Sequence, residues 1–183
     1  MQLRWSHAVV FVRDLDAMLD FYTNVLGFEV SDRGPLAPGA PEIVFMSQVE
    51  TDHHQLAFAP VRQGEEPPNS VDHFAFRVES LADVREMLER LEKDGRATRI
   101  DPMTHGNAWS VYFKDPEGNG IEIFCDTPWH VAQPLRFSID LSLPDGELIA
   151  WTKERISGHA DFQPAAEWFD GLEGRLGKAA PER

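Results

Sequence analysis

Several histidines and one glutamate of this chain have the residue types and the sequence context for metal or proton chemistry. His7 and His73 each open a strand-like apolar run, and His53 and His54 stand side by side at the head of another. Glu122 lies inside a further apolar run, where an inward-pointing carboxylate is costly unless it is paired or bound to a metal. Two histidines and one carboxylate on adjacent strands form the facial triad that holds Fe(II) in non-haem oxygenases and leaves coordination positions open.

The elements that would position these residues form an internal repeat. HAVVFVRDLDAML, which starts at His7, aligns without a gap with HFAFRVESLADVR, which starts at His73. In both segments about six strand-like residues lead to a helix-capping residue, Asp14 or Ser80, and then to apolar residues at helical spacing. Each predicted helix ends near a glycine, which favours a left-handed cap.

Three short strand candidates follow each predicted helix, so each half has the order β-α-β-β-β. They span residues 28–32, 42–47, 53–59, 97–101, 108–114 and 120–126. Neither half buries a sheet face alone, whereas two paired halves do. The sequence therefore predicts an α+β fold in which paired βαβββ modules, about 4–60 and 70–126, form a curved mixed sheet around a cleft.

The pattern changes after residue 127. We expect residues 1–127 to form one domain and residues 128–183 to be a C-terminal extension with two short amphipathic helices, near 148–156 and 164–176. Trp168 and Phe169 in the second helix need a surface to cover them. The extension is expected to pack on the domain, where it would cap the cleft, or on a dimer partner.

A pseudo-twofold between the modules would bring four positions together in the cleft: His7, His73, a residue near 53–56 and a residue near 122. A single histidine in a strand is more often a hydrogen-bonded core residue than a ligand. Because His7, His73 and Glu122 occupy related positions of a repeat, we interpret these three residues as metal ligands.

Composition restricts the partners and the compartment. The formal net charge of −14 disfavours nucleic acid and anionic membrane surfaces as partners. Cys125 is the only cysteine, which excludes an intrachain disulfide and suits a reducing cytosol. The sequence has neither a signal-like apolar region at its start nor an apolar run long enough to span a membrane. We expect a cytoplasmic protein.

The motifs SHAVVFV, FYTNVLGFEV, VDHFAFRV and YFKDPEGNGIEIFCD resemble the vicinal-oxygen-chelate (glyoxalase/bleomycin resistance/dioxygenase) superfamily over about residues 4–127. Within it the chain is most similar to single-domain type I extradiol dioxygenases. The resemblance implies Fe(II), or Mn(II) as in some relatives, bound by His7, His73 and Glu122. It further implies a homodimeric oxidoreductase that inserts both atoms of O2 into a catechol-type aromatic diol and gives a muconic semialdehyde-type product.

The same resemblance assigns roles to three further residues. Extradiol enzymes have a proton-handling histidine on the strand before the second metal histidine, and His54 matches that position. Because side chains alternate along a strand, we expect His53 to face away from the cleft. His105 and Tyr112 match the groups that hydrogen-bond the oxygens of the bound diol.

Other activities of the superfamily remain alternatives. Glyoxalase-like isomerases generally add a carboxylate ligand from the last strand of the other module, and residues 53–59 contain neither Asp nor Glu. Fosfomycin-type transferases share the triad but generally need a cationic pocket, whereas Arg4, Arg13, Arg62 and Arg77 are scattered. A non-catalytic drug-binding member would leave the triad unexplained. The sequence does not define the substituents of the diol or the position of ring cleavage.

Overall fold

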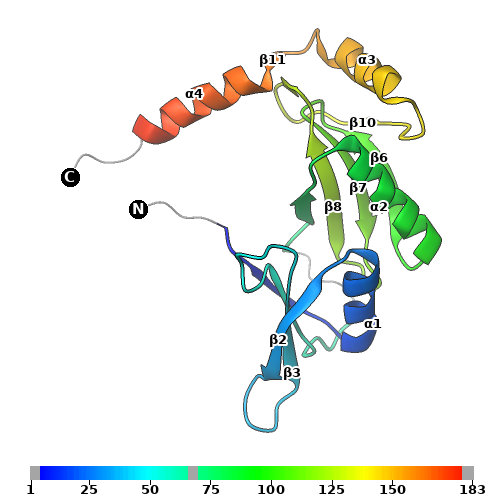
Figure 1. Ribbon diagram of the computed structural model, residues 1–183, viewed down its shortest axis with the longest axis vertical. Coiled ribbons are helices and arrows are strands. Elements are labelled where there is room, and N and C mark those ends of the chain that lie inside the picture. The colour runs from blue at the N-terminus through cyan, green and yellow to red at the C-terminus, as the bar shows by residue number, and fades with distance from the viewer. Residues whose placement is uncertain (1–4, 66–69, 179–183) are drawn as a thin grey trace.

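The computed structural model describes residues 5–65 and 70–178 of the chain (Figure 1). The first half consists of β1 (Ala8–Phe11), α1 (Leu15–Asp20), a π-helical turn η1 (Phe21–Val25), β2 (Glu29–Pro35), β3 (Glu42–Ser47) and β4 (Leu56–Ala59). The second half repeats the order with β5 (Phe74–Arg77), α2 (Leu81–Asp94), β6 (Thr98–Thr104), β7 (Ala108–Lys114) and β8 (Gly120–Asp126).

Each half forms its own mixed sheet. The strand orders are β1-β4-β3-β2 and β5-β8-β7-β6, with the short strand β10 (Phe137–Ser138) added beside β6. In each half the first strand runs parallel to the last, and the remaining neighbours are antiparallel. The sheets follow one another along an open curve, with α1 and α2 on its outer side (Figure 1). This is the predicted α+β fold of two βαβββ modules.

The helix signals in the sequence correspond to real caps. The Asp14 side chain accepts a hydrogen bond from the Ala17 amide, and Ser80 forms a capping box with Asp83. Gly95, which ends α2, has a φ of 78°, a left-handed conformation that glycine adopts without steric cost.

Two local features differ from the sequence-based expectation. The first helix changes to π-helical geometry after Asp20, and the turn buries Phe21 and Tyr22. Strand β4 begins at Leu56 instead of residue 53, so His53 and His54 belong to the loop before it. The spacing of apolar residues does not reveal a π turn, which has one more residue than an α-helical turn. It also does not show where a strand begins after a polar segment.

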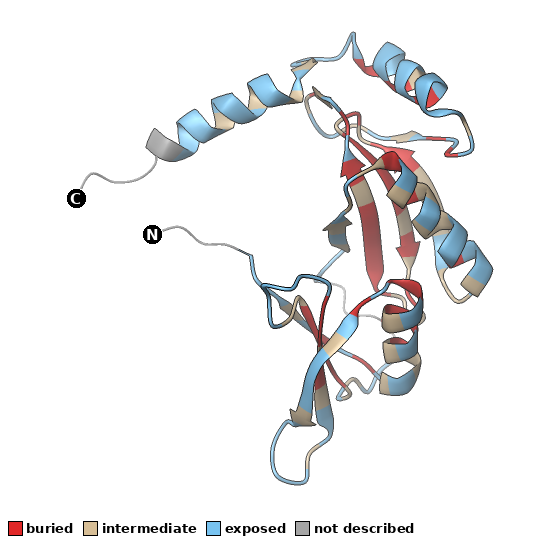
Figure 2. Ribbon diagram, viewed as in Figure 1, coloured by how far each residue is buried: buried red, intermediate tan, exposed pale blue. Residues whose placement is uncertain are grey.

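The core lies between the sheets and the two module helices (Figure 2). Met18, Phe21 and Leu91 on the helices are completely or almost completely buried, as are the sheet residues that face them. Trp109 and Phe113 belong to this core, with 4% and 2% of their surfaces exposed. Phe124 lies on the other sheet face, beneath the Arg77 guanidinium.

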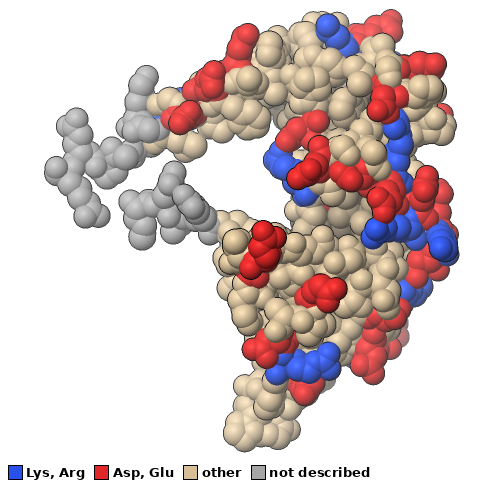
Figure 3. All heavy atoms as spheres, in the orientation of Figure 1, with Lys and Arg blue, Asp and Glu red and all other residues tan. Residues whose placement is uncertain are grey.

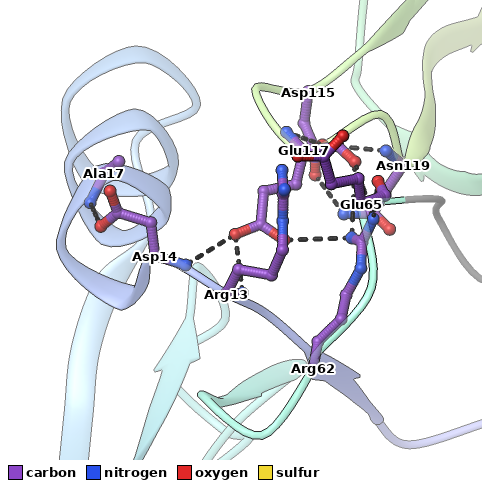
Figure 4. A network of polar contacts seen from close by, with 8 residues as sticks. All are labelled: Arg13, Asp14, Ala17, Arg62, Glu65, Asp115, Glu117 and Asn119. Carbon is purple, nitrogen blue, oxygen red and sulfur yellow. Dashed lines mark hydrogen bonds and ion pairs between the residues drawn. The ribbon is translucent and has the colours of Figure 1, made fainter.

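A polar junction joins the modules at the turn between β7 and β8 (Figure 4). One carboxylate oxygen of Glu117 accepts hydrogen bonds from the backbone amides of Arg13 and Asp14, both at 2.8 Å. Its second oxygen lies 3.0 Å from the Arg62 guanidinium. Since both ionic side chains are more than nine-tenths buried, this junction fixes the β7–β8 turn against the corner between β1 and α1.

The same turn is stiffened by Asp115. Its carboxylate accepts hydrogen bonds from the amides of Glu117 and Asn119, from the Asn119 side chain and from the Tyr22 hydroxyl. Burial, the nearby charge of Asp115 and this hydrogen bond raise the pKa of the Tyr22 phenol. The phenol therefore remains a donor, and η1, which follows α1, is tied to the β7–β8 turn from a second direction.

The C-terminal extension contains β9 (Trp129–His130), β10, α3 (Asp145–Ile156), β11 (Gln163–Pro164) and α4 (Ala165–Lys178). It contacts the second module: β10 pairs with β6, and the Trp109 indole donates a hydrogen bond to the Thr152 hydroxyl on α3. Helix α4 projects away from the sheets (Figure 1). In the described ranges, the helices are too short or too polar to cross a membrane.

The Glu117 junction predicts a large effect on stability. Replacing Glu117 with Ala leaves Arg62 buried without its partner and two amides without their acceptor. We expect the free energy of unfolding to fall by about 3–5 kcal/mol, measured by urea denaturation. Glu89→Ala, on the exposed face of α2, is the matched control and should change stability by less than about 0.5 kcal/mol. Equal midpoints for the two variants would show that the junction contributes nothing.

Candidate metal and proton-transfer site

The two strands that lead each module place His7 and His73 on equivalent faces. On β1, Val10 is buried against the helices, whereas Val9 and Phe11 are exposed by 49% and 54%. On β5, the exposed residues likewise alternate with residues packed against the core. Because side chains alternate along a strand, His7 and His73, each one residue before its strand, continue the face turned away from α1 and α2.

A cleft of about 860 Å³ separates the modules near these histidines. Its walls come from the start of β1, the β3–β4 loop and the whole of β5, and His73 lines it. The space-filling view shows the molecule as an open C with its hollow between the α4 side and the first module (Figure 3). The cleft also extends to the helix side of β5, where Leu26, Phe28 and Met87 line it.

His73 and Glu122 come together in the second module. The Nε2 atom of His73 lies 3.2 Å from Oε2 of Glu122, and the Ser110 hydroxyl donates a hydrogen bond of 2.7 Å to Oε1. Glu122 is 7% exposed. A carboxylate so buried needs a positive partner, and Ser110 satisfies only one of its oxygens.

Asp72 fixes the orientation of the His73 ring. Its carboxylate lies 2.7 Å from Nδ1 of His73, so Nδ1 carries the proton and donates. The hydrogen bond and charge of His73 hold the pKa of Asp72 below its usual range. In the neutral imidazole, the Nε2 lone pair then faces a carboxylate oxygen. Two ligands at right angles around one ion, each about 2.1 Å from it, lie about 3 Å apart. The pair therefore fits a divalent cation, and a carboxylate behind a ligating histidine is a common supporting contact.

His105 and Tyr112 lie beside this pair. The Tyr112 hydroxyl is 3.0 Å from Nε2 of His105, and the Tyr112 ring packs edge-on against His73 with 5.2 Å between centroids. Burial and the neighbouring Glu122 carboxylate raise the pKa of the Tyr112 phenol. The phenol stays protonated and donates hydrogen bonds at neutral pH.

His54 and His7 form a second group, in the first module. Their ring centroids are 4.2 Å apart, and Phe45 packs against His54 at 4.9 Å. Burial, and then the charges of His7 and His53, lower the pKa of His54. The imidazole of His54 is consequently neutral at physiological pH.

Alternation along a strand does not explain the orientations of His53 and His54, because neither residue belongs to β4. Their Nδ1 atoms are 2.9 Å apart in the loop. His53 is nevertheless the outer member: its side chain is 59% exposed, and it lies 3.7 Å from Asp32.

The structure does not join the two groups into one ligand set. In residues 5–65 and 70–178, we find no cluster of three or more His, Cys, Asp or Glu side chains placed to hold a metal ion. His73 and Glu122 meet in one module, and His7 contacts His54 in the other. The sequence did not reveal the contacts of Asp72 and Ser110, although Asp72 adjoins His73 and Ser110 lies two residues before Tyr112 on the same strand face.

Strand register identifies the counterpart of Glu122 in the first module. Ala75 of β5 pairs with Glu122, and Val9 of β1 pairs with Ala57. Since Val9 and Ala75 are equivalent in the repeat, Ala57 occupies the position that we had placed near His54. An alanine cannot supply a further carboxylate ligand there.

Three of the four arginines considered for a phosphonate pocket are engaged with acidic partners. Arg13 and Arg62 converge on Glu117, and Arg77 forms an ion pair with Asp126. Arg4 lies outside the described residues. Arg13, Arg62 and Arg77 are therefore not free to form a cationic pocket for a phosphonate.

Comparisons with known proteins agree with this architecture. The family model described as "Glyoxalase/Bleomycin resistance protein/Dioxygenase superfamily" matches residues 4–123. A glyoxylase/bleomycin resistance protein/dioxygenase domain from Frankia sp. EAN1pec superposes with a TM-score of 0.58 at 24% identity, over 71% of this chain and 96% of that one. A FosX fosfomycin resistance protein from Listeria monocytogenes, at 21% identity and a TM-score of 0.54 over 69% of this chain and 96% of that one, shares the fold.

Curated relatives carry more than one activity in their names. Biphenyl-2,3-diol 1,2-dioxygenase 2 of Rhodococcus globerulus is 28% identical over 86% of this chain and 88% of the relative. A biphenyl-2,3-diol 1,2-dioxygenase of Metapseudomonas furukawaii is 34% identical over 64% of this chain, but the match spans only 38% of that protein. A lactoylglutathione lyase of Neisseria meningitidis is 30% identical over 66% of this chain and 88% of the relative.

The contact between Asp72 and His73 predicts a change in metal affinity. Asp72→Asn should weaken binding of Fe(II) or Mn(II) by about 10- to 100-fold, because the amide no longer holds the charge behind Nδ1 of His73. Anaerobic calorimetric titration measures the dissociation constant, and Asp16→Asn on the exposed side of α1 is the control. Equal affinity in both variants would contradict the claim that Asp72 supports His73 as a metal ligand.

Proposed function

We infer that this chain, which belongs to the glyoxalase/bleomycin resistance protein/dioxygenase superfamily, is an extradiol dioxygenase that opens a catechol-type aromatic ring with O2. The observation that carries the proposal is the buried Glu122 facing the Nε2 lone pair of His73, with Tyr112 and His105 beside them. The names of curated relatives support an aromatic diol as the substrate and O2 as the co-substrate.

The proposed ligands of the metal are His73 and Glu122 from the second module and His7 from the first. Imidazole and carboxylate groups suit Fe(II), the ion that we propose, and Mn(II) is the alternative ion. A bound Fe(II) ion would bring the diol and O2 to one centre and pass electrons from the aromatic ring to O2. The residues around it must then bind the diol, orient it and move its protons.

Tyr112 and His105 are placed to bind and orient the diol. The Tyr112 phenol is a donor because its pKa is raised, so it can hydrogen-bond a diol oxygen that has lost its proton. Nε2 of His105 accepts from the Tyr112 hydroxyl in the diol-free site. A bound diol that displaces this hydrogen bond would free the Tyr112 donor for one diol oxygen and the Nε2 lone pair for the hydroxyl that keeps its proton. A donor on Tyr112 next to an acceptor on His105 would therefore bind a diol that has one deprotonated oxygen and one hydroxyl group.

His54 is proposed to move the proton. Its neutral imidazole accepts a proton from the diol as the diol binds and returns it to oxygen when the O–O bond breaks. The rings of Phe45 and His7 both pack against the His54 imidazole. His53, being largely exposed, has no part in this step.

The isomerase alternative has less support. The position equivalent to Glu122 in the first module is Ala57, which leaves no carboxylate to act as a further ligand or as a base. The transferase alternative has no support from Arg13, Arg62 and Arg77, since each of them is paired with a carboxylate.

The activity can be tested directly. The protein is loaded with Fe(II) under nitrogen and then mixed with catechol, 3-methylcatechol or 2,3-dihydroxybiphenyl in air. We expect a yellow ring-fission product and the uptake of one O2 per diol consumed. Tight metal binding without product from any diol would contradict the proposal. Conversion of the hemithioacetal of methylglyoxal and glutathione would indicate the isomerase instead.

Replacement of His54 separates proton transfer from metal binding. His54→Ala should lower the turnover number by about a hundredfold or more, while the iron content per chain stays at the wild-type value. His159→Ala, an exposed histidine of the extension, is the control. Unchanged turnover in the His54 variant would remove this residue from the mechanism.

A further inference from the structure

A segment of the C-terminal extension lies directly against His105. Between β9 and β10 the chain passes through Gln133 and Leu135, and β10 then pairs with the end of β6 immediately before His105. Gly106, the next residue, has no room for a side chain: a Cβ there would lie 2.6 Å from Val131 and 3.3 Å from Leu135. The extension is thus packed onto the backbone that carries His105.

Three hydrogen bonds close a ring between this segment and His105. Nδ1 of His105 donates to the Leu135 carbonyl at 2.6 Å. The Gln133 side-chain amide donates to the His105 carbonyl at 2.7 Å, and its oxygen accepts from the Leu135 amide at 3.0 Å. The Gln133 side chain therefore hydrogen-bonds the backbone of His105 and of Leu135, and it holds the Leu135 carbonyl against the His105 imidazole.

This ring determines where the proton of His105 resides. A carbonyl oxygen only accepts hydrogen bonds, so Nδ1 must be protonated. In the neutral imidazole, Nε2 is then the acceptor, and the Tyr112 hydroxyl donates to it. If the Leu135 carbonyl moved away, both tautomers of His105 would become accessible, and the one protonated at Nε2 would present a donor to the site.

We propose that Gln133 is a positioning residue that holds the Leu135 carbonyl against Nδ1 of His105 and so keeps Nε2 of His105 a hydrogen-bond acceptor for the diol. The catalytic consequence rests on the proposed dioxygenase function, whereas the tautomer is a property of the protein alone. The C-terminal extension thereby has a defined role at the site, because it determines which nitrogen of His105 carries the proton and which one accepts a hydrogen bond.

The test is the tautomer of His105 in the metal-free protein, read from long-range proton–nitrogen NMR correlations with ¹⁵N-labelled histidine. A His105→Asn variant assigns the signal. In wild-type protein we expect the Nδ1-protonated form. In Gln133→Ala, the Nε2-protonated form should rise to a fraction comparable with the other, and in the Fe(II)-loaded enzyme kcat should fall about tenfold with KM changed less than about twofold.

Gln163→Ala is the matched control, because the Gln163 side chain donates only to the Asp161 carbonyl. It should leave both the tautomer and kcat at wild-type values. If Gln133→Ala does not fold, Gln133→Glu is measured instead; it keeps the acceptor for the Leu135 amide, loses the donor to the His105 carbonyl and should shift the tautomer in the same direction.

An unchanged tautomer in the folded Gln133 variant would overturn the proposal, as would a shifted tautomer with unchanged kcat. A wild-type enzyme that cleaves no diol would refute the proposed function without changing the NMR result. Failure of the positioning role and failure of the dioxygenase function are therefore distinguishable.

Discussion

The buried carboxylate of Glu122 is the constraint on which the site depends. It lies 3.2 Å from the Nε2 atom of a histidine whose other nitrogen donates to Asp72, so two acceptors face each other when the imidazole is neutral. Such a pair is costly in a metal-free protein unless the imidazole takes a second proton, and it becomes favourable around a divalent cation. Ser110 holds the carboxylate in place from the adjacent strand.

The fold supplies this pair by repetition. Each βαβββ module has one histidine before its first strand and pairs that strand with its last one. Only the second module has a carboxylate on the last strand at this register, because the residue equivalent to Glu122 in the first module is Ala57. The Glu117 junction and the Tyr22–Asp115 hydrogen bond hold the modules together on their outer side. Between the modules a cleft remains, with His73 on its wall.

The repeat, the caps at Asp14 and Ser80 and the module order could be predicted because each depends on local sequence and a fixed period. Strand register could not: the equivalence of Ala57 with Glu122 depends on loop lengths that periodicity does not contain. The contacts of His105 were also inaccessible, since they come from a carbonyl about 30 residues away in an irregular segment. The joint metal site of His7, His73 and Glu122 stays a prediction, because the structure places His7 with His54.

The most direct measurement is X-ray absorption spectroscopy of the anaerobic Fe(II)-loaded protein, which counts imidazole ligands around the ion. We predict two imidazoles in the wild-type protein and one in each of the His7→Ala and His73→Ala variants, with Glu122→Ala keeping both. An unchanged imidazole count in His7→Ala would contradict the claim that the two modules share one metal ion.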